Sequence, residues 1–522
     1  MSLIALILLL FAATAALRVL ADRSGIPLPT LLVLGGLGLA FLPGLPHLTL
    51  DPETVFLIFI PPLLFWAALT SSLRDLKRNL RPITLLAVWL VLITMAVVAV
   101  VVHELIPTLP WALCFVLGAI VSPPDAVAVI ATTRRLSLPR TSLVILEGES
   151  LANDATAIVA YQVALAAAVS GTFSLPRAGA ELLFTGAGGI AVGLATAWCV
   201  GWVRLHLKRS SVVENTVSLL SPFIAFIPAN ALGCSGVLAV ITMGLFLGRR
   251  GPRVVSAPTR LQGTSMWEML SFLLEGLIFI LIGLQLPQVV RALDRDALGR
   301  LVEVSIAVTA AMIVTRIVWM FVAAYGPRWI EKRLGRAGIA YPPWRHVLFL
   351  GWAGIRGGDS LVIALALPYV AVPGAPPEAR AVLIFITFVV ILITLVVQGL
   401  TLTPVIRLLG IVGGNEEQTE ERNARNASLR AGAAALEQLT GAEHEKDIAA
   451  ALRRAAAYRL ERLNSGHSTP PTYARLRLAM LAAEREAVID MRDRNEISDG
   501  VMRRLQQEFD HEELLLKHDD GD

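Results

Sequence analysis

Residues 117–133 read LGAIVSPPDAVAVIATT, an apolar run interrupted in its middle by Pro123, Pro124 and Asp125. A run of this length is enough to cross a lipid bilayer as a helix. Because proline lacks the N–H that an interior helical residue donates, the pair frees backbone carbonyl groups beside the carboxylate. Freed carbonyls at membrane depth are tolerated only where they line a cavity or bind something. The stretch therefore predicts a broken membrane helix whose oxygen atoms suit a hard cation.

The next apolar stretch is rich in polar groups. Residues 141–169 read TSLVILEGESLANDATAIVAYQVALAAAV. Residues four apart share one face of a helix, so Ser150 and Asp154 can point together at Asp125. We expect these three side chains to be ligands of a hard cation, because a carboxylate at membrane depth marks a functional site. The structural alternative is a polar network that only holds helices together.

Three further side chains of the same stretch are candidates for supporting roles. Glu149 and Asn153 are four apart and form a polar pair on the adjacent face. Glu147 lies about two turns from Asp154 and is placed for the cytoplasmic approach to the site. A purely structural role is an open alternative for both glutamates.

A second interrupted stretch lies near the end of the apolar region. Residues 346–368 read HVLFLGWAGIRGGDSLVIALALP, where glycines weaken the helix around Arg356 and Asp359. A buried guanidinium needs an anionic partner, and Glu149 is our candidate for Arg356. Asp359 can cap the second half-helix, bind Arg356 or join the ion path. Arg316 and Glu275 are further buried ionisable residues that can pair with each other or line a packing interface.

The apolar stretches together predict an all-α, polytopic membrane protein. We expect spans near residues 3–20, 25–42, 52–70, 82–103, 111–133, 141–170, 179–203, 214–231, 235–248, 266–286, 299–325, 345–370 and 379–409. The interrupted fifth and twelfth spans take matching positions if spans 1–6 and 8–13 are two units related by inversion. Interrupted segments in matching positions indicate a transport site near the middle of the bilayer.

Charge divides the chain into two parts. The sequence is 55% hydrophobic and 16% charged, against about 25% charged residues in soluble proteins, which excludes an ordinary soluble enzyme. Residues 1–412 carry a net charge of +10, and residues 413–522 a net charge of −6. Lys and Arg gather in every second predicted loop, which places the N-terminus outside and the C-terminus in the cytoplasm. The positive charge therefore sets orientation and does not indicate nucleic-acid binding.

The tail, residues 413–522, is helix-prone and predicts a helical cytoplasmic domain. Its segments 449–463 and 475–494 show helical periodicity.

The expected chemistry is exchange. A cation and a proton compete for Asp154 and Asp125, and a site that reorients only when occupied turns competition into exchange. Asn153 stands beside Asp154 where a second carboxylate would add a titrating charge, which favours electroneutral one-for-one exchange. An intramembrane aspartyl hydrolase is an alternative, but it needs two carboxylates that share a proton and water rather than a Ser, Asn and carbonyl shell. A cation channel is a third possibility.

The ordered motifs resemble the sodium/proton exchangers of the first monovalent cation/proton antiporter group. The resemblance covers nearly all of residues 1–410. It rests on PPLLFWAAL at 61–69, SPPDAVAV at 122–129, EGESLANDATAIV at 147–159, FLLEGLIFILIGLQL at 272–286 and GIRGGDSL at 354–361. It implies thirteen spans in the plasma membrane and a homodimer. It also implies a core of ion-carrying helices near 82–170 and 299–409, and no cofactor besides the transported Na⁺ and H⁺.

The resemblance also implies roles for single residues. The family's cation-binding groups fall on the Pro124 carbonyl, Asp125, Ser150, Asn153 and Asp154. Its buried Glu–Arg pair falls on Glu149 and Arg356. The Asn next to the ion-binding Asp is typical of the electroneutral branch. Family members usually have a small or apolar residue where Asp359 stands here.

Overall fold

The computed structural model describes residues 3–42, 52–133, 138–171, 175–206, 210–291, 293, 295–334, 341–368, 372–411 and 416–439, and parts of 449–513. All regular elements in these residues are helices. The chain divides into two units, Met1–Gly413 and Gly414–Asp522.

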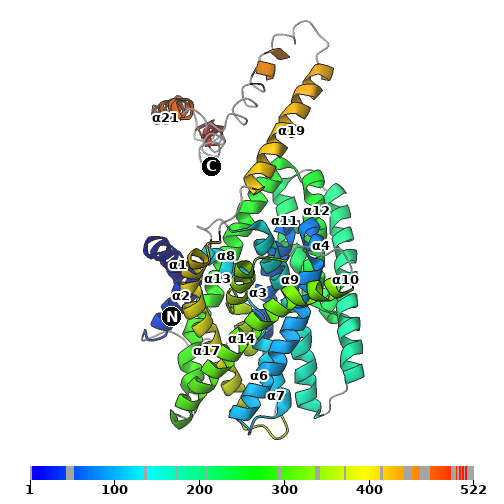
Figure 1. The fold of residues 1–522 in the computed structure, drawn as a ribbon. Helices are drawn as coiled ribbons and strands as arrows, with labels where there is room; N and C mark the ends of the chain where they lie inside the picture. Colours follow the sequence, from blue (N-terminus) through cyan, green and yellow to red (C-terminus); the bar gives the residue numbers. More distant parts are fainter. Residues whose placement is uncertain are drawn as a thin grey trace. The chain divides into compact units, whose positions relative to one another are not determined.

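The first half of the first unit runs from α1 to α9 (Figure 1). Its helices are α1 Leu3–Ser24, α2 Leu28–Leu39, α3 Pro52–Thr70, α4 Leu73–Arg78, α5 Leu80–Thr84, η1 Leu85–Leu90, α6 Val91–Leu105, α7 Trp111–Val121, α8 Ala126–Thr133 and α9 Arg140–Ser170.

The second half runs from α10 to α18. Its helices are α10 Leu175–His206, α11 Ser211–Ala231, α12 Gly236–Val254, α13 Ala257–Arg291, α14 Arg295–Arg333, α15 Trp344–Trp352, α16 Gly358–Leu365, α17 Ala379–Ile393, η2 Thr394–Gln398 and α18 Gly399–Leu409. Within the described residues, each apolar stretch expected from the sequence thus contains a helix or a series of helical segments.

The composition of these helices fits a membrane. Eight helical segments of the described chain are long and apolar enough to cross a bilayer, and α2, α7 and most of α3 are shorter apolar helices. Large apolar side chains are exposed along α10 and α14, for example Leu183 at 73% and Val314 at 59%. In water such faces would be costly, whereas against lipid they are not.

Helix packing in the first unit depends on close backbone approach. The α2–α13 contact is among the most extensive, and α6 lies beside α7 (Figure 1). A Cβ atom on Gly36 would lie 2.1 Å from the Ile280 carbonyl oxygen, and one on Gly283 would lie 2.2 Å from that of Val33. Only glycine fits at these two positions, as is usual where membrane helices pack tightly.

The two predicted interruptions are present. Residues 122–125 separate α7 from α8, and residues 353–357 separate α15 from α16. In both places the chain continues in a helix after the break.

The second unit contains α19 Glu416–Leu439 and α21 Pro471–Asp493. The helix predicted at 475–494 lies almost wholly within α21 and is confirmed. Much of the helix predicted at 449–463 lies outside the described residues.

Candidate cation site

The two broken helices meet at their breaks. The backbone N–H of Asp125 donates a hydrogen bond of 2.8 Å to the carbonyl oxygen of Ile355. Pro123 and Pro124 supply no N–H of their own, so the segment before α8 departs from helical geometry. The contact places the carboxylate of one break directly against the backbone of the other.

Gly357 makes room for Asp125. A Cβ atom at position 357 would lie 2.0 Å from Asp125 Oδ2 and 2.5 Å from its Cγ. The space that a side chain would need is therefore filled by the carboxylate. This glycine is required for the close approach of the two segments.

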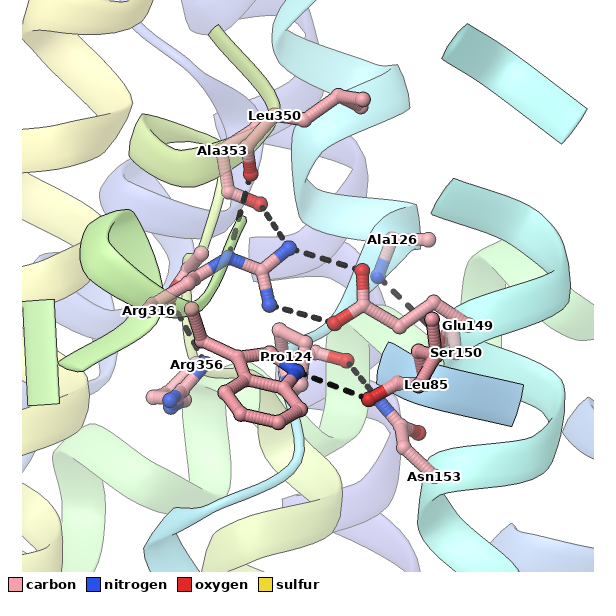
Figure 2. A network of polar contacts seen from close by, with 12 residues as sticks. Leu85, Pro124, Ala126, Glu149, Ser150, Asn153, Arg316, Leu350, Ala353 and Arg356 are labelled. Atoms are coloured by element: carbon pink, nitrogen blue, oxygen red, sulfur yellow. Dashed lines mark hydrogen bonds and ion pairs between the residues drawn. The ribbon is translucent and has the colours of Figure 1, made fainter. Parts of the chain in front are cut away.

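Side chains of helix α9 form hydrogen bonds to the interrupted segment around residues 122–126 (Figure 2). Asn153 Nδ2 donates to the Pro124 carbonyl oxygen at 3.2 Å, and the N–H of Ala126 donates to Ser150 Oγ at 3.4 Å. Ser150 and Asn153 thus fix the carbonyl and the first N–H that flank Asp125. The structure brings together the five residues expected to form the cation site, Pro124, Asp125, Ser150, Asn153 and Asp154.

The oxygen atoms around Asp125 suit a cation. Asn153 is fully buried, and its Oδ1 accepts no hydrogen bond in the part of the chain that is described. Asp154 is 6% exposed and interacts electrostatically with Asp125 and Asp359. The three carboxylates of Asp125, Asp154 and Asp359 repel one another, so a cation or protons must offset their charge.

The accessory acids occupy two positions. Asp359 lies in the first turn of α16 and interacts electrostatically with Asp125. Its carboxylate is therefore part of the same charge cluster. Glu147 is half-buried on α9, on the N-terminal side of the cluster.

The buried ion pair has a different basic partner from the one expected. Arg316 Nη1 lies 2.5 Å from Glu149 Oε1, and its Nη2 donates to Glu149 Oε2 at 2.9 Å (Figure 2). Both residues are 1% exposed. The predicted pair of Glu149 with Arg356 is therefore wrong, because the terminal nitrogens of Arg316 bind Glu149.

The reason is the packing of α14 against α15. Arg316 Nε donates to the Leu350 carbonyl at 3.2 Å, and Nη2 reaches the Ala353 carbonyl at 3.5 Å. These carbonyls lie in the last turn of α15 and just beyond it, where helical partners are missing. The Arg316 guanidinium therefore links α14 to α9 and to the start of the interruption between α15 and α16.

The Arg356 side chain forms a hydrogen bond within its own interrupted segment. Its Nη1 donates to the Gly354 carbonyl at 3.1 Å, and its backbone N–H donates to Thr394 Oγ1 at 3.2 Å. It is 2% exposed, and its charge interacts with those of Glu149 and Arg316. Sequence reasoning missed the contribution of Thr394, and no local pattern at this position signals it.

Comparison with known proteins matches the chain to a family. Residues 6–408 match the model of the transmembrane sodium/hydrogen exchangers. The chain belongs to the sodium/hydrogen exchanger family. An uncharacterised Na⁺/H⁺ exchanger of Mycobacterium tuberculosis is 34% identical over 98% of this chain and 95% of its own.

Relatives with more specific names are also similar to this exchanger. A sodium, potassium, lithium and rubidium/H⁺ antiporter of Bacillus subtilis is 31% identical over 94% of this chain and 74% of its own. A Na⁺/H⁺ antiporter of Aphanothece halophytica is 34% identical over 77% and 74%.

A solved structure shares the fold. The sodium proton antiporter MjNhaP1 of Methanocaldococcus jannaschii aligns with a TM-score of 0.62 at 22% identity, covering 78% of this exchanger and 98% of that chain. The chain is thus a multi-pass membrane protein of an antiporter family, and its named relatives are transporters rather than enzymes.

Proposed function

We propose that this exchanger carries Na⁺, with Li⁺ and K⁺ as alternative cargo, against H⁺ across the plasma membrane by alternating access. The cation and the proton compete for Asp154 and Asp125. The observation that carries this proposal is the meeting of two broken helices at Asp125. Beside it, α9 presents Asp154 and the Asn153 Oδ1 atom, which accepts no hydrogen bond from the described residues.

The binding step uses residues with distinct roles. Asp125 and Asp154 supply negative charge, and Ser150, Asn153 and the Pro124 carbonyl supply neutral oxygen atoms to complete the shell. When the cation leaves, protons offset the carboxylate charge, so the site is never left with its full repulsion. Obligatory occupancy by one or the other ion gives exchange rather than leakage.

The exchanger is proposed to be electroneutral and needs no resident cofactor. Asn153 next to Asp154 limits the charge that each half-cycle carries, although Asp359 adds a carboxylate to the cluster. A potential imposed across proteoliposomes should leave the rate of Na⁺/H⁺ exchange unchanged. A rate that changes with the potential would show instead that each transport cycle moves net charge.

The proposal extends to topology and assembly. Thirteen crossings place the N-terminus outside and the C-terminus in the cytoplasm, with spans 1–6 and 8–13 as inverted units. The core domain consists of the helices near 82–170 and 299–409, and the remaining helices form a scaffold through which two copies make a homodimer.

Collapse of a pH gradient in everted membrane vesicles tests the site. Added Na⁺ should dissipate the gradient with wild-type protein and fail to do so with Asp154→Asn. Asp22→Asn alters an exposed carboxylate on α1 and should behave like the wild type. Unchanged exchange in Asp154→Asn would refute the assignment, and parallel runs with Na⁺, Li⁺ and K⁺ measure selectivity.

A further inference from the structure

A cavity of about 100 Å³ opens between α10 and α12, remote in sequence from the cation site. It lies near the end of both helices, which pack against each other along their length. Trp198, Trp202 and Arg204 line it from α10, and Phe246 and Arg250 line it from α12. No step of the proposed exchange uses these residues.

The cavity is positively charged. The Arg204 Nε is enclosed and has no hydrogen-bond partner among the described residues. The Arg250 guanidinium stacks over the Phe246 ring at 4.4 Å, which orients its nitrogens without neutralising them. Glu214, buried on α11, interacts electrostatically with Arg204. Among the described residues, the carboxylate of Glu214 is the one acid recorded against these two guanidinium groups, so the cavity favours an anion.

Two glycines keep space open beside these arginines. Gly201 and Gly251 both line the cavity, and a Cβ atom on either would meet nothing within 4 Å. The volume equals several water molecules, since one needs roughly 10–15 Å³. A phosphate-sized group therefore has both room and charge partners.

The surroundings of the cavity are those of a membrane surface. Trp198 and Trp202 are 61% and 54% exposed, and Leu205 beside them is 67% exposed. Tryptophan is enriched where the hydrocarbon meets the headgroups, and basic pockets between membrane helices bind anionic headgroups. Arg249 and Arg250 follow the apolar part of α12, so this end of the helix pair carries the basic residues.

We propose that this cavity binds an anionic phospholipid. Its phosphate lies between Arg204 and Arg250, and its acyl chains run along Trp198 and Trp202. A free phosphate shares the charge chemistry but gains nothing from the exposed apolar wall, which is why the lipid is the expected occupant.

Energy transfer from tryptophan to a lipid with a pyrene-labelled acyl chain tests the proposal in detergent. Pyrene-phosphatidylglycerol should bind the purified full chain, and pyrene-phosphatidylcholine should bind far more weakly. Loss of either arginine, Arg204→Gln or Arg250→Gln, should weaken phosphatidylglycerol binding about fivefold. Arg249→Gln changes an exposed arginine outside the cavity and should leave binding unchanged.

A second variant covers the case in which an arginine variant fails to fold. Gly201→Leu keeps both arginines and fills the cavity, so it too should weaken binding while its gel-filtration profile stays that of the wild type. Equal binding of phosphatidylcholine, or undiminished binding in Gly201→Leu and the arginine variants, would overturn the proposal. Displacement of the lipid by inorganic phosphate at equal concentration would show that the site holds a free anion instead.

Discussion

At the scale of single residues, the Glu149–Arg316 pair places two opposite charges on side chains that are almost fully buried. Removing one partner of a buried pair leaves the other charge uncompensated, at a cost of about 3–5 kcal/mol. We therefore expect Glu149→Gln to lower the apparent melting temperature in detergent markedly. Glu149→Gln combined with Arg316→Met should recover part of the loss. Glu268→Gln changes an exposed glutamate on α13 and is the matched control. Equal melting temperatures of Glu149→Gln and Glu268→Gln would contradict this account.

Gly357 offers a test of the site that leaves every proposed ligand residue unchanged in sequence. Gly357→Ala puts a methyl group where Asp125 Oδ2 lies, so the carboxylate must move. Such overpacking costs about 1–3 kcal/mol, which the fold can tolerate. We expect a folded protein whose Na⁺-dependent collapse of the pH gradient is strongly reduced. Gly38→Ala meets nothing within 4 Å and should exchange normally. Normal exchange in Gly357→Ala would mean that the position of Asp125 is not critical.

Residues close in sequence were predictable, and partners from distant helices were not. The i, i+4 spacing of Ser150 and Asp154 and the prolines before Asp125 are local facts, and the structure places these groups together. The partner of Glu149 depends on how α14 crosses α15, which is a matter of tertiary packing. Arg356 belongs to the GIRGGDSL motif, but its guanidinium donates to the Gly354 carbonyl in its own interrupted segment.

At the scale of elements, the two helix interruptions can be predicted from proline and glycine residues. The two π-helical segments cannot be predicted in this way. The breaks at 122–125 and 353–357 arise where N–H groups are missing or helix propensity is low. The π-helical segments η1 and η2 have no such signal, because their sequences are ordinary apolar runs. η2 begins with Thr394, whose hydroxyl accepts the N–H of Arg356, and π-helical turns are frequent at functional sites.

An ion pair in the second unit makes the stability of that unit depend on pH. Arg477 of α21 donates to both carboxylate oxygens of Glu512, at 2.7 and 2.8 Å. Its hydrogen bonds hold the pKa of Glu512 below the ordinary value of 4.5. The contact therefore stabilises the folded unit at pH values above 4.5, and this stabilisation is lost as the pH falls through the lowered pKa of Glu512.

Hydrogen exchange measures this effect. After correction for intrinsic rates, amides near residue 512 should exchange faster below pH 4.5 than at neutral pH. Glu512→Gln should already show the faster exchange at neutral pH and little further change on acidification. Glu508→Gln, which alters an exposed neighbour, serves as the control. Identical protection in Glu512→Gln and wild type at neutral pH would show that the contact does not hold this segment.

At the scale of the whole molecule, the charge division of the sequence coincides closely with a structural one. The hydrophobic part ends near residue 412, and the structure separates Met1–Gly413 from Gly414–Asp522. The match to the family model ends at residue 408. All the residues of the candidate cation site, and both arginines of the lipid cavity, belong to the first unit.

A chain that ends at Gly413 should therefore keep the exchange reaction. We expect the truncated protein to collapse the pH gradient with the same half-maximal Na⁺ concentration as the full chain, because no ligand of the cation is removed. Rates are compared per molecule of protein in the vesicle membrane, so that lower expression is not mistaken for lower activity. A changed pH dependence with unchanged Na⁺ affinity would assign the tail a regulatory role. Loss of Na⁺ affinity in a correctly inserted protein would instead show that the tail shapes the site itself.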